Sequence, residues 1–244
     1  RVEGCRAVGA QEVADLCDLV FLTTPDDAIP QVARQLRWRP GQGVVHTSGA
    51  DSLDVLEKPR ADGAEVGAFH PLQSFASVEH ALDNLPGSTF ALEGEPPLLD
   101  TLKQVAEALE GRWVALRPGD KVLYHAAAVI ACNYFVTLVK LATDLWASFG
   151  ASPAQAVEAL LPLLRGTLAN IERVGLPHCL TGPIARGDVG TVSKHLEALE
   201  ARFPEIASTY RDLGLKTVPI ALGKGRIDEE KAEELRRLLG GDHH

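Results

Sequence analysis

Two histidines, His46 and His70, stand at the ends of short apolar runs (residues 43–47 and 65–69) in the first third of the chain. Short apolar runs bounded by polar residues are typical of buried strands. In an open α/β sheet, ligands bind outside the carboxyl ends of parallel strands. An imidazole in that place can exchange a proton near neutral pH or donate a hydrogen bond. We therefore expect both histidines to lie beside one binding site.

Further polar residues follow the same runs: Ser48 and Gly49 after the first, Gln73 and Ser74 after the second. Ser48 could bind a carboxylate or carbonyl group, or act as a nucleophile with either histidine as its base. The motif Gly-x-Ser-x-Gly does not surround it and nothing identifies an oxyanion hole, so nucleophilic hydrolysis is the weaker interpretation. A purely structural role remains the alternative for each histidine.

A third apolar run, residues 18–23, ends in Thr24-Pro25-Asp26 and leads into a helical pattern over residues 26–37. Asp26 is suited to cap the start of that helix. The free N–H groups and the positive dipole end of a helix attract phosphate or carboxylate groups. A simple capped turn is an equally good interpretation.

Lys121 and His125 are four residues apart in a helical pattern, so both should project from one face of the helix. Asn133 returns roughly to that face about three turns later. Tyr124 and Asn133 are polar groups in a mostly apolar helix, and a buried polar group needs a partner, which could be a ligand. Lys121 could protonate a carbonyl oxygen or hold a carboxylate. The alternative is that Lys121 lies in an exposed first turn.

Arg186 lies in a loop over residues 180–188 that contains Gly182, Pro183 and Gly187 and interrupts the helical second half. A guanidinium group can bind a carboxylate or phosphate through two hydrogen bonds. A salt bridge of Arg186 within the loop, with Asp188 capping the next helix, is at least as good an explanation.

The residues that commonly bind metals have no metal-site spacing. The histidines at 46, 70 and 125 could in principle hold zinc, but no closely spaced pair supports a site, and we predict none. The cysteines fit neither a zinc ribbon nor a disulfide framework, and we interpret them as free, mostly buried thiols in a reducing cytoplasm. They are Cys5, Cys17, Cys132 and Cys179.

Composition and charge bear on the kind of partner. The 244 residues carry a net charge of -9 and no basic block, which argues against nucleic acid or an anionic membrane as partner. No apolar run reaches the roughly 18 residues of a membrane span. We expect a soluble cytoplasmic protein that acts on a small molecule. His243 and His244 have the character of a purification tag and are excluded from the functional argument.

The first half of the chain, residues 1–117, alternates strand and helix patterns, which predicts βαβ units and a mainly parallel α/β sheet. The expected helices cover residues 10–16, 26–37, 52–62 and 96–110. The expected strands cover residues 5–8, 18–23, 43–47, 65–69, 88–92 and 112–116.

The second half, residues 118–240, is predicted to be entirely helical. It opens with a run free of proline and glycine over residues 120–149 that is apolar on more than one face. Such a helix should be the buried spine of a helical domain or a subunit interface. Further helices are expected over residues 153–173, 189–199, 204–222 and 228–239, the first with Ser152 as its cap and Pro153 at its first position.

These motifs in combination resemble a known family. Thr-x-Pro-Asp-Asp, His-Thr-Ser-Gly-Ala, His-Pro-Leu-Gln-Ser-Phe, Tyr-His-Ala-Ala-Ala and Thr-Gly-Pro-Ile-Ala-Arg-Gly-Asp are similar to the Rossmann-like proteins that carry the helical domain of unknown function 2520, over residues 4–222. The family is similar to ketopantoate reductase, pyrroline-5-carboxylate reductase and the β-hydroxyacid dehydrogenases. The resemblance implies a nicotinamide-dependent reductase with a helical domain like the C-terminal domain of 6-phosphogluconate dehydrogenase, and a homodimer through that domain.

The resemblance also implies roles for residues. Thr24, Pro25 and Asp26 would flank the ribose and nicotinamide of NADP or NAD, and Ser48 and Gly49 would lie beside the nicotinamide. His70, Gln73 and Ser74 would line the substrate cleft. From their residue types, His46, Asn133 and Arg186 are further substrate-binding candidates, and Lys121, His125 and His70 are the catalytic candidates. Lys121 and His125 match the Lys-x₃-Asn pair of β-hydroxyacid dehydrogenases except that histidine replaces asparagine.

One family feature is missing from the sequence. Relatives begin with a strand, a glycine-rich loop, a helix and a second strand, and no Gly-x-Gly-x-x-Gly motif occurs here. We therefore expect an N-terminally truncated chain that binds NAD(P) poorly. Two alternatives to the reductase stay open: a non-redox dimeric protein that binds a small ligand, and a hydrolase that uses Ser48 or a histidine-bound metal.

Overall fold

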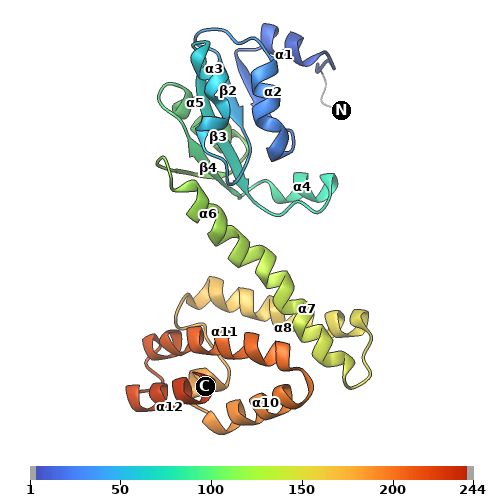
Figure 1. The fold of residues 1–244 in the computed structure, drawn as a ribbon, viewed down its shortest axis with the longest axis vertical. Coiled ribbons are helices and arrows are strands. Elements are labelled where there is room, and N and C mark those ends of the chain that lie inside the picture. The colour runs from blue at the N-terminus through green and yellow to red at the C-terminus, as the bar shows by residue number, and fades with distance from the viewer. Residues whose placement is uncertain (1–3, 241–244) are drawn as a thin grey trace. The chain divides into compact units, whose positions relative to one another are not determined.

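The structure is a computed structural model that describes residues 4–240, so His243 and His244 lie outside the described residues. The chain divides into two compact units, one ending at Val136 and one beginning at Thr137. Each unit is considered by itself (Figure 1). The predicted α/β half ends at residue 117, but the first compact unit also takes in helix α6 (Lys121–Ala128), whose side chains contact His70 and Gly49.

The first unit contains a five-stranded sheet in the order β1-β2-β3-β4-β5. Neighbouring strands are parallel except for β3 and β4, which are antiparallel. The predicted α/β class with a mainly parallel sheet is thus confirmed. The strands are β1 (Leu19–Leu22), β2 (Gly43–His46), β3 (Glu65–Leu72), β4 (Thr89–Glu93) and β5 (Arg112–Ala115).

Helices cover both faces of this sheet and bury a separate apolar core on each. One core joins Val20 and Val44 to residues of the helices that precede β3, and the other joins Val45 and Phe69 to α5. The two cores follow from the alternation of side chains along a strand, which sends Val44 and Val45 to opposite faces. The helical segments are α1 (Ala10–Leu16), η1 (Asp26–Ala28), α2 (Ile29–Gln35), η2 (Leu53–Leu56), α3 (Glu57–Ala61), α4 (Val78–Asn84) and α5 (Leu98–Ala108).

Three local predictions for this unit were wrong. Residues 5–8 are not a strand in the structure. Helix α4, capped by the side chain of Ser77, was not predicted, although its apolar residues Val78, Ala81 and Leu82 have helical spacing. Strand β3 runs on to Leu72, so His70 lies within the strand and not after it, where β4 pairs with it in antiparallel orientation.

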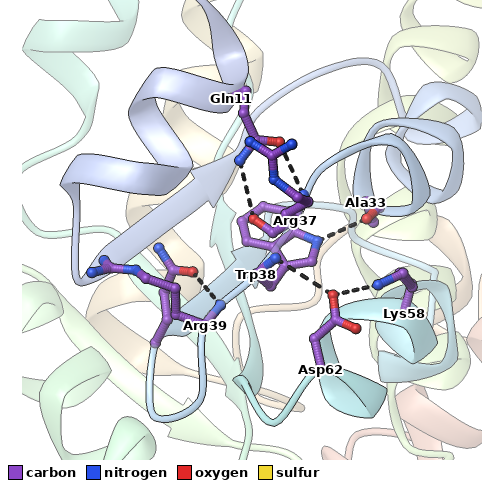
Figure 2. Close-up of polar contacts among 8 residues, drawn as sticks. Gln11, Ala33, Arg37, Trp38, Arg39, Lys58 and Asp62 are labelled. Atoms are coloured by element: carbon purple, nitrogen blue, oxygen red, sulfur yellow. Dashed lines mark hydrogen bonds and ion pairs between the residues drawn. The ribbon is translucent and has the colours of Figure 1, made fainter.

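A network of hydrogen bonds fixes the connection between α2 and β2, as Figure 2 shows. The indole N–H of Trp38 donates to the carbonyl oxygen of Ala33 at 2.8 Å, and its backbone N–H donates to the Asp62 carboxylate at 3.4 Å. The Gln11 side chain bonds to both backbone groups of Arg37, at 3.0 and 3.3 Å. These bonds hold β2, and with it the loop that follows His46, in register with its neighbours.

The second unit is entirely helical in its described part, as the sequence predicts. Ser152 caps α8 with a full capping box and Pro153 occupies its first position, as expected. The predicted uninterrupted helix over residues 120–149 is interrupted before this unit begins, by a π-helical turn of the first unit, η3 (Val129–Asn133), between α6 and α7. The helices are α7 (Tyr134–Ala147), α8 (Pro153–Val174), α9 (Pro183–Arg186), α10 (Val189–Arg202), α11 (Pro204–Gly223) and α12 (Glu229–Gly240).

The apolar helices α7 and α8 are largely exposed in the single chain. Only Thr143 of α7 and Ala156 of α8 are buried. The stretch Lys121–Ala147 has a mean hydropathy of 1.7 and by length and composition alone could cross a membrane, contrary to our estimate from the sequence. None of its most apolar segment is buried, so the prediction of a buried spine does not hold within one chain.

The thiols also differ from expectation. Cys5, Cys17 and Cys132 are exposed and Cys179 is partly buried, and all four are free. The prediction of free thiols is confirmed, whereas the prediction that most are buried was wrong.

We predict that Gln42→Leu lowers the free energy of unfolding by about 2–4 kcal/mol. The buried Gln42 amide donates to the carbonyl oxygens of Ala14 and Cys17 at 2.7 and 2.6 Å and accepts from the Arg39 backbone at 3.2 Å, so an apolar replacement leaves these groups unpaired. Urea denaturation measures the change. The control is Gln31→Leu at an exposed position of α2, and equal stability of the two variants would contradict the prediction.

Candidate active site

The candidate site is built on a row of side chains that crosses the sheet. His46 of β2 pairs with Ala68 of β3, and Ala68 pairs with Glu93 of β4. Residues directly opposite one another on adjacent strands point to the same face. The small Ala68 therefore lies between an imidazole and a carboxylate, all three buried at 5% exposure or less. This row is the floor of the site.

Lys121, the first residue of α6, is buried against this floor. Its side chain is only 2% exposed and its Nζ atom has no hydrogen-bond partner among the described residues. Burial lowers the pKa of Lys121 to about 8, and the negative charge of Glu93 is the largest influence in the opposite direction. The alternative of an exposed first-turn lysine is excluded by this burial. Burial in turn raises the pKa of Glu93.

His46 is held as a neutral hydrogen-bond donor. Its Nδ1 atom accepts from the backbone N–H of Ser48 at 3.2 Å, so the ring proton belongs on Nε2. That Nε2 atom is enclosed and without a partner among the described residues. Burial first, and then the charge of Lys121, lower the pKa of His46 to about 3, so the ring stays uncharged at neutral pH.

Ser48 is fully engaged in holding the loop after β2. Its hydroxyl donates to the Asp26 carboxylate at 2.7 Å and accepts from the backbone N–H groups of Ala50 and Asp51, at 3.3 and 3.1 Å. The sequence predicted that Asp26 caps its helix. In the structure it makes no capping hydrogen bond and instead joins the ends of β1 and β2. A hydroxyl that donates to a carboxylate and not to an imidazole lacks the base that a serine nucleophile needs.

The second histidine lies next to two aromatic side chains of α6. The His70 Nδ1 atom is 2.9 Å from the Tyr124 hydroxyl, and the rings of His70 and His125 meet edge to face with centroids 6.1 Å apart. Gly49 makes this approach possible, because a Cβ atom there would lie 2.8 Å from His70 Nε2 and 2.6 Å from His125 Cδ2. Burial and the charge of Lys121 lower the pKa of His70 to about 4.

The structure thus brings together most of the residues singled out at the strand ends. Thr24 and Pro25 follow β1. The hydroxyl oxygen of Thr24 is enclosed without a partner among the described residues, and Pro25 is exposed. Lys121 and His125 do share one face of α6, as their spacing predicts. All these residues belong to the first compact unit.

Other predicted site residues have local roles in the structure. Gln73 donates to the carbonyl oxygen of Asn84 and to the hydroxyl of Ser88, at 3.1 and 3.2 Å, and so ties the chain after β3 to the end of α4. Ser74 is exposed and its backbone N–H donates to the Gln73 side chain at 2.8 Å. Asn133 lies in the exposed π-helical turn.

Arg186 belongs to the second compact unit. It pairs with Asp188 at 3.9 Å with its side chain 65% exposed, and Asp188 caps α10 by accepting from the Thr191 backbone at 3.0 Å. The structure therefore has the local salt bridge and cap that the sequence offered as the alternative to ligand binding.

Two residues of the site were not predicted, Glu93 and Tyr124. Glu93 ends an apolar run and gave no motif signal, because its place beside Lys121 depends on the antiparallel pairing of β4 with β3. Tyr124 was noted as a polar group in an apolar helix but was given no role. Tyr124 comes three residues after Lys121, on the side of the helix that carries Lys121 and His125. That spacing could have indicated that it belongs to the site.

Comparison with known families decides the relationship. A model described as a Rossmann-like domain matches residues 1–71, and one described as domain of unknown function (DUF2520) matches residues 88–217, more than half of the chain. The chain belongs to the DUF2520 family. The family resemblance seen in the sequence is thereby confirmed. No curated protein matches this DUF2520 protein.

Three solved structures illustrate the fold that this chain shares. Protein TM1727 from Thermotoga maritima is 29% identical, with a TM-score of 0.75 over 85% of this chain and 80% of its own. A candidate NADP oxidoreductase, BF3122 from Bacteroides fragilis, is 22% identical, with a TM-score of 0.68 over 87% and 80%. A pyrroline-5-carboxylate reductase from Coxiella burnetii is 16% identical, with a TM-score of 0.56 over 95% and 80%. This DUF2520 protein shares their fold.

The buried neutral histidines predict acid sensitivity. The pKa of His46 is about 3 in the folded protein against 6.5 ordinarily, so the unfolded chain binds a proton that the folded chain does not. Above pH 6.5 the histidine is neutral in both states and has no effect of this kind. As the pH falls below 6.5, the free energy of unfolding decreases by up to about 1.4 kcal/mol per pH unit for each such histidine. His46→Asn, which keeps an acceptor for the Ser48 N–H, should flatten the loss between pH 6.5 and 4 in urea titrations. His80→Asn on exposed α4 is the control, and equal slopes for both variants would contradict the account.

Proposed function

We propose that this DUF2520 protein is an NADP- or NAD-dependent reductase of a small carbonyl, imine or hydroxy-acid type substrate. The observation that carries the proposal is the buried, unpaired ammonium group of Lys121 beside His46 and Glu93. A buried lysine whose pKa lies near neutrality is suited to give a proton to an oxygen or nitrogen that gains negative charge.

The pKa values divide the roles in the cluster. His46 and His70, with pKa values of about 3 and about 4, carry no acidic proton at neutral pH. Burial raises the pKa of Tyr124 to about 12, so its hydroxyl is a weak acid. The Lys121 ammonium, with a pKa of about 8, is protonated at pH 7 and still acidic. Lys121 is therefore the proton source in the proposal, and the neutral histidines are hydrogen-bond donors.

The proposed cofactor follows from the fold neighbours, among them the candidate NADP oxidoreductase and a pyrroline carboxylate reductase from Plasmodium falciparum with NADP bound. A bound nicotinamide would supply the hydride. In the proposal, Thr24, Pro25 and Asp26 after β1, with Ser48 and Gly49 after β2, would hold it. Two observations fit this role: the bare backbone of Gly49, and the enclosed, unpaired hydroxyl of Thr24.

The hydrolase alternatives have less support. The Ser48 hydroxyl donates to Asp26, and His46 accepts from the Ser48 backbone, so neither histidine is placed as its base. Within residues 4–240, no group of three or more histidine, cysteine or acidic side chains could hold a metal.

The proposal includes a homodimer through the helical domain, in the cytoplasm. Large apolar side chains that a single chain leaves exposed favour an interface. The exposed fraction is 66% for Leu163, 56% for Leu168 and 44% for Ile171, all on α8. A second copy of the chain would cover these side chains.

We predict that Lys121→Met lowers kcat for NADPH- or NADH-dependent reduction by about 10²–10⁴-fold. The assay follows loss of the reduced nicotinamide against a panel of small aldehydes, 2-oxoacids and cyclic imines. Because the protonated amine is required, reduction by the wild type should decline as the pH rises through about 8. Lys140→Met, at an exposed lysine paired with Asp144, is the control.

Two results would contradict the reductase proposal. One is a wild-type protein that turns over no member of the panel with either nucleotide, even at nucleotide concentrations high enough to saturate weak binding, which would favour the ligand-binding alternative. The other is a Lys121→Met variant as active as the Lys140→Met control.

For the dimer, we predict that Leu163→Glu raises the dissociation constant at least about tenfold, since a carboxylate would have to be desolvated at the interface. Sedimentation equilibrium measures the constant. The control is Leu82→Glu on α4, where the leucine is 70% exposed in the other unit. A monomeric wild type, or a dimer equally stable in both variants, would reject the proposed interface.

A further inference from the structure

Tyr124 contacts His70 in a geometry that can fix the state of the imidazole. The Tyr124 hydroxyl oxygen lies 2.9 Å from His70 Nδ1, and the two rings meet edge to face at 85°. Both side chains are partly buried in the same compact unit. A hydrogen bond to one ring nitrogen of a histidine determines which nitrogen carries the proton.

Both partners of this hydrogen bond are neutral at pH 7. Burial raises the pKa of Tyr124 to about 12, so the phenol keeps its proton. Within the described residues His70 is the hydrogen-bond partner of that hydroxyl, and His70 is itself neutral. A phenol that donates to Nδ1 would leave the single ring proton of His70 on Nε2.

The Nε2 side of His70 lies where a ligand can reach it. It has no hydrogen-bond partner among the described residues, and it is not enclosed, unlike Nε2 of His46 and Nζ of Lys121. It lies against the bare backbone of Gly49, where a Cβ atom would come within 2.8 Å. Of these three nitrogen atoms, His70 Nε2 is the one that keeps accessible surface in the structure.

We propose that Tyr124 is a positioning residue that locks His70 as its Nε2–H tautomer, so that His70 donates a hydrogen bond to the oxygen or nitrogen of the substrate bond being reduced. The inference rests on the proposed reductase function. A neutral imidazole that donates to a developing negative charge stabilises it without having to be charged. Lys121 then remains the source of the proton, and His70 orients and polarises the bond.

The chain offers a matched control for this pair. In the second compact unit, His195 Nδ1 lies 2.9 Å from the Tyr210 hydroxyl with the rings at 87°. Its geometry is nearly the same, yet it contains none of the proposed catalytic residues. Tyr124→Phe and Tyr210→Phe therefore remove the same hydroxyl from equivalent pairs.

The first test is the tautomer itself, read from ¹H–¹⁵N correlations of the imidazole rings in ¹⁵N-histidine-labelled protein. In the wild type, His70 should be the Nε2–H form. Tyr124→Phe should convert a measurable fraction of His70 to the Nδ1–H form and leave His195 unchanged, and Tyr210→Phe should leave His70 unchanged. An Nδ1–H form in the wild type, or a His70 spectrum unaltered by Tyr124→Phe, would overturn the inference.

The second test is kinetic. Tyr124→Phe should lower kcat by about tenfold while changing KM little, because the donor is needed as charge develops. Tyr210→Phe should leave both unchanged. Unaltered kcat in a Tyr124→Phe variant with an altered tautomer would reject the catalytic role. If the wild type reduces nothing, the reductase proposal fails and the catalytic role of Tyr124 fails with it, whereas the tautomer spectrum still decides whether Tyr124 sets the state of His70.

Discussion

The structure of the first unit depends on one costly arrangement, the burial of the Lys121 ammonium group. Moving a charge out of water is unfavourable unless opposite charge or hydrogen bonds offset it. Glu93 supplies the opposite charge, and it stands in one row with Ala68 and His46 across the sheet. The antiparallel pairing of β4 with β3 is what places the carboxylate in this row. The sheet order and the start of α6 are thus constrained by the same group.

That burial also sets the chemistry of its neighbours. The charge of Lys121 adds to desolvation in keeping His46 and His70 neutral, so both can serve as donors and not as acids. Around them, Asp26 and Ser48 join the ends of β1 and β2, and Gly49 lets the imidazoles approach the loop. An ionisable amine among neutral donors is the arrangement expected of a site that protonates a substrate as it is reduced.

Local patterns predicted much of this, and pairing between strands accounts for the rest. The apolar runs located all five strands, and the four-residue spacing placed Lys121 and His125 on one helical face. The role of Glu93 could not be predicted, because the register of β4 against β3 is a contact between distant segments. Asp26 was misjudged as a cap, because a carboxylate before a helix also suits a distant hydroxyl, here Ser48. Arg186 was a substrate candidate on residue type alone, whereas its neighbour Asp188 offers a local partner.

The central claim is that Lys121 is a buried amine that remains acidic near neutral pH. Its most direct test is an NMR titration of the side-chain amine in protein with ¹³C-labelled lysine, with Lys121→Met used to assign the signal. The account predicts a pKa of about 8, well below the ordinary 10.5. A Lys121 signal that titrates at 10.5 or above, together with the exposed lysines, would contradict the account.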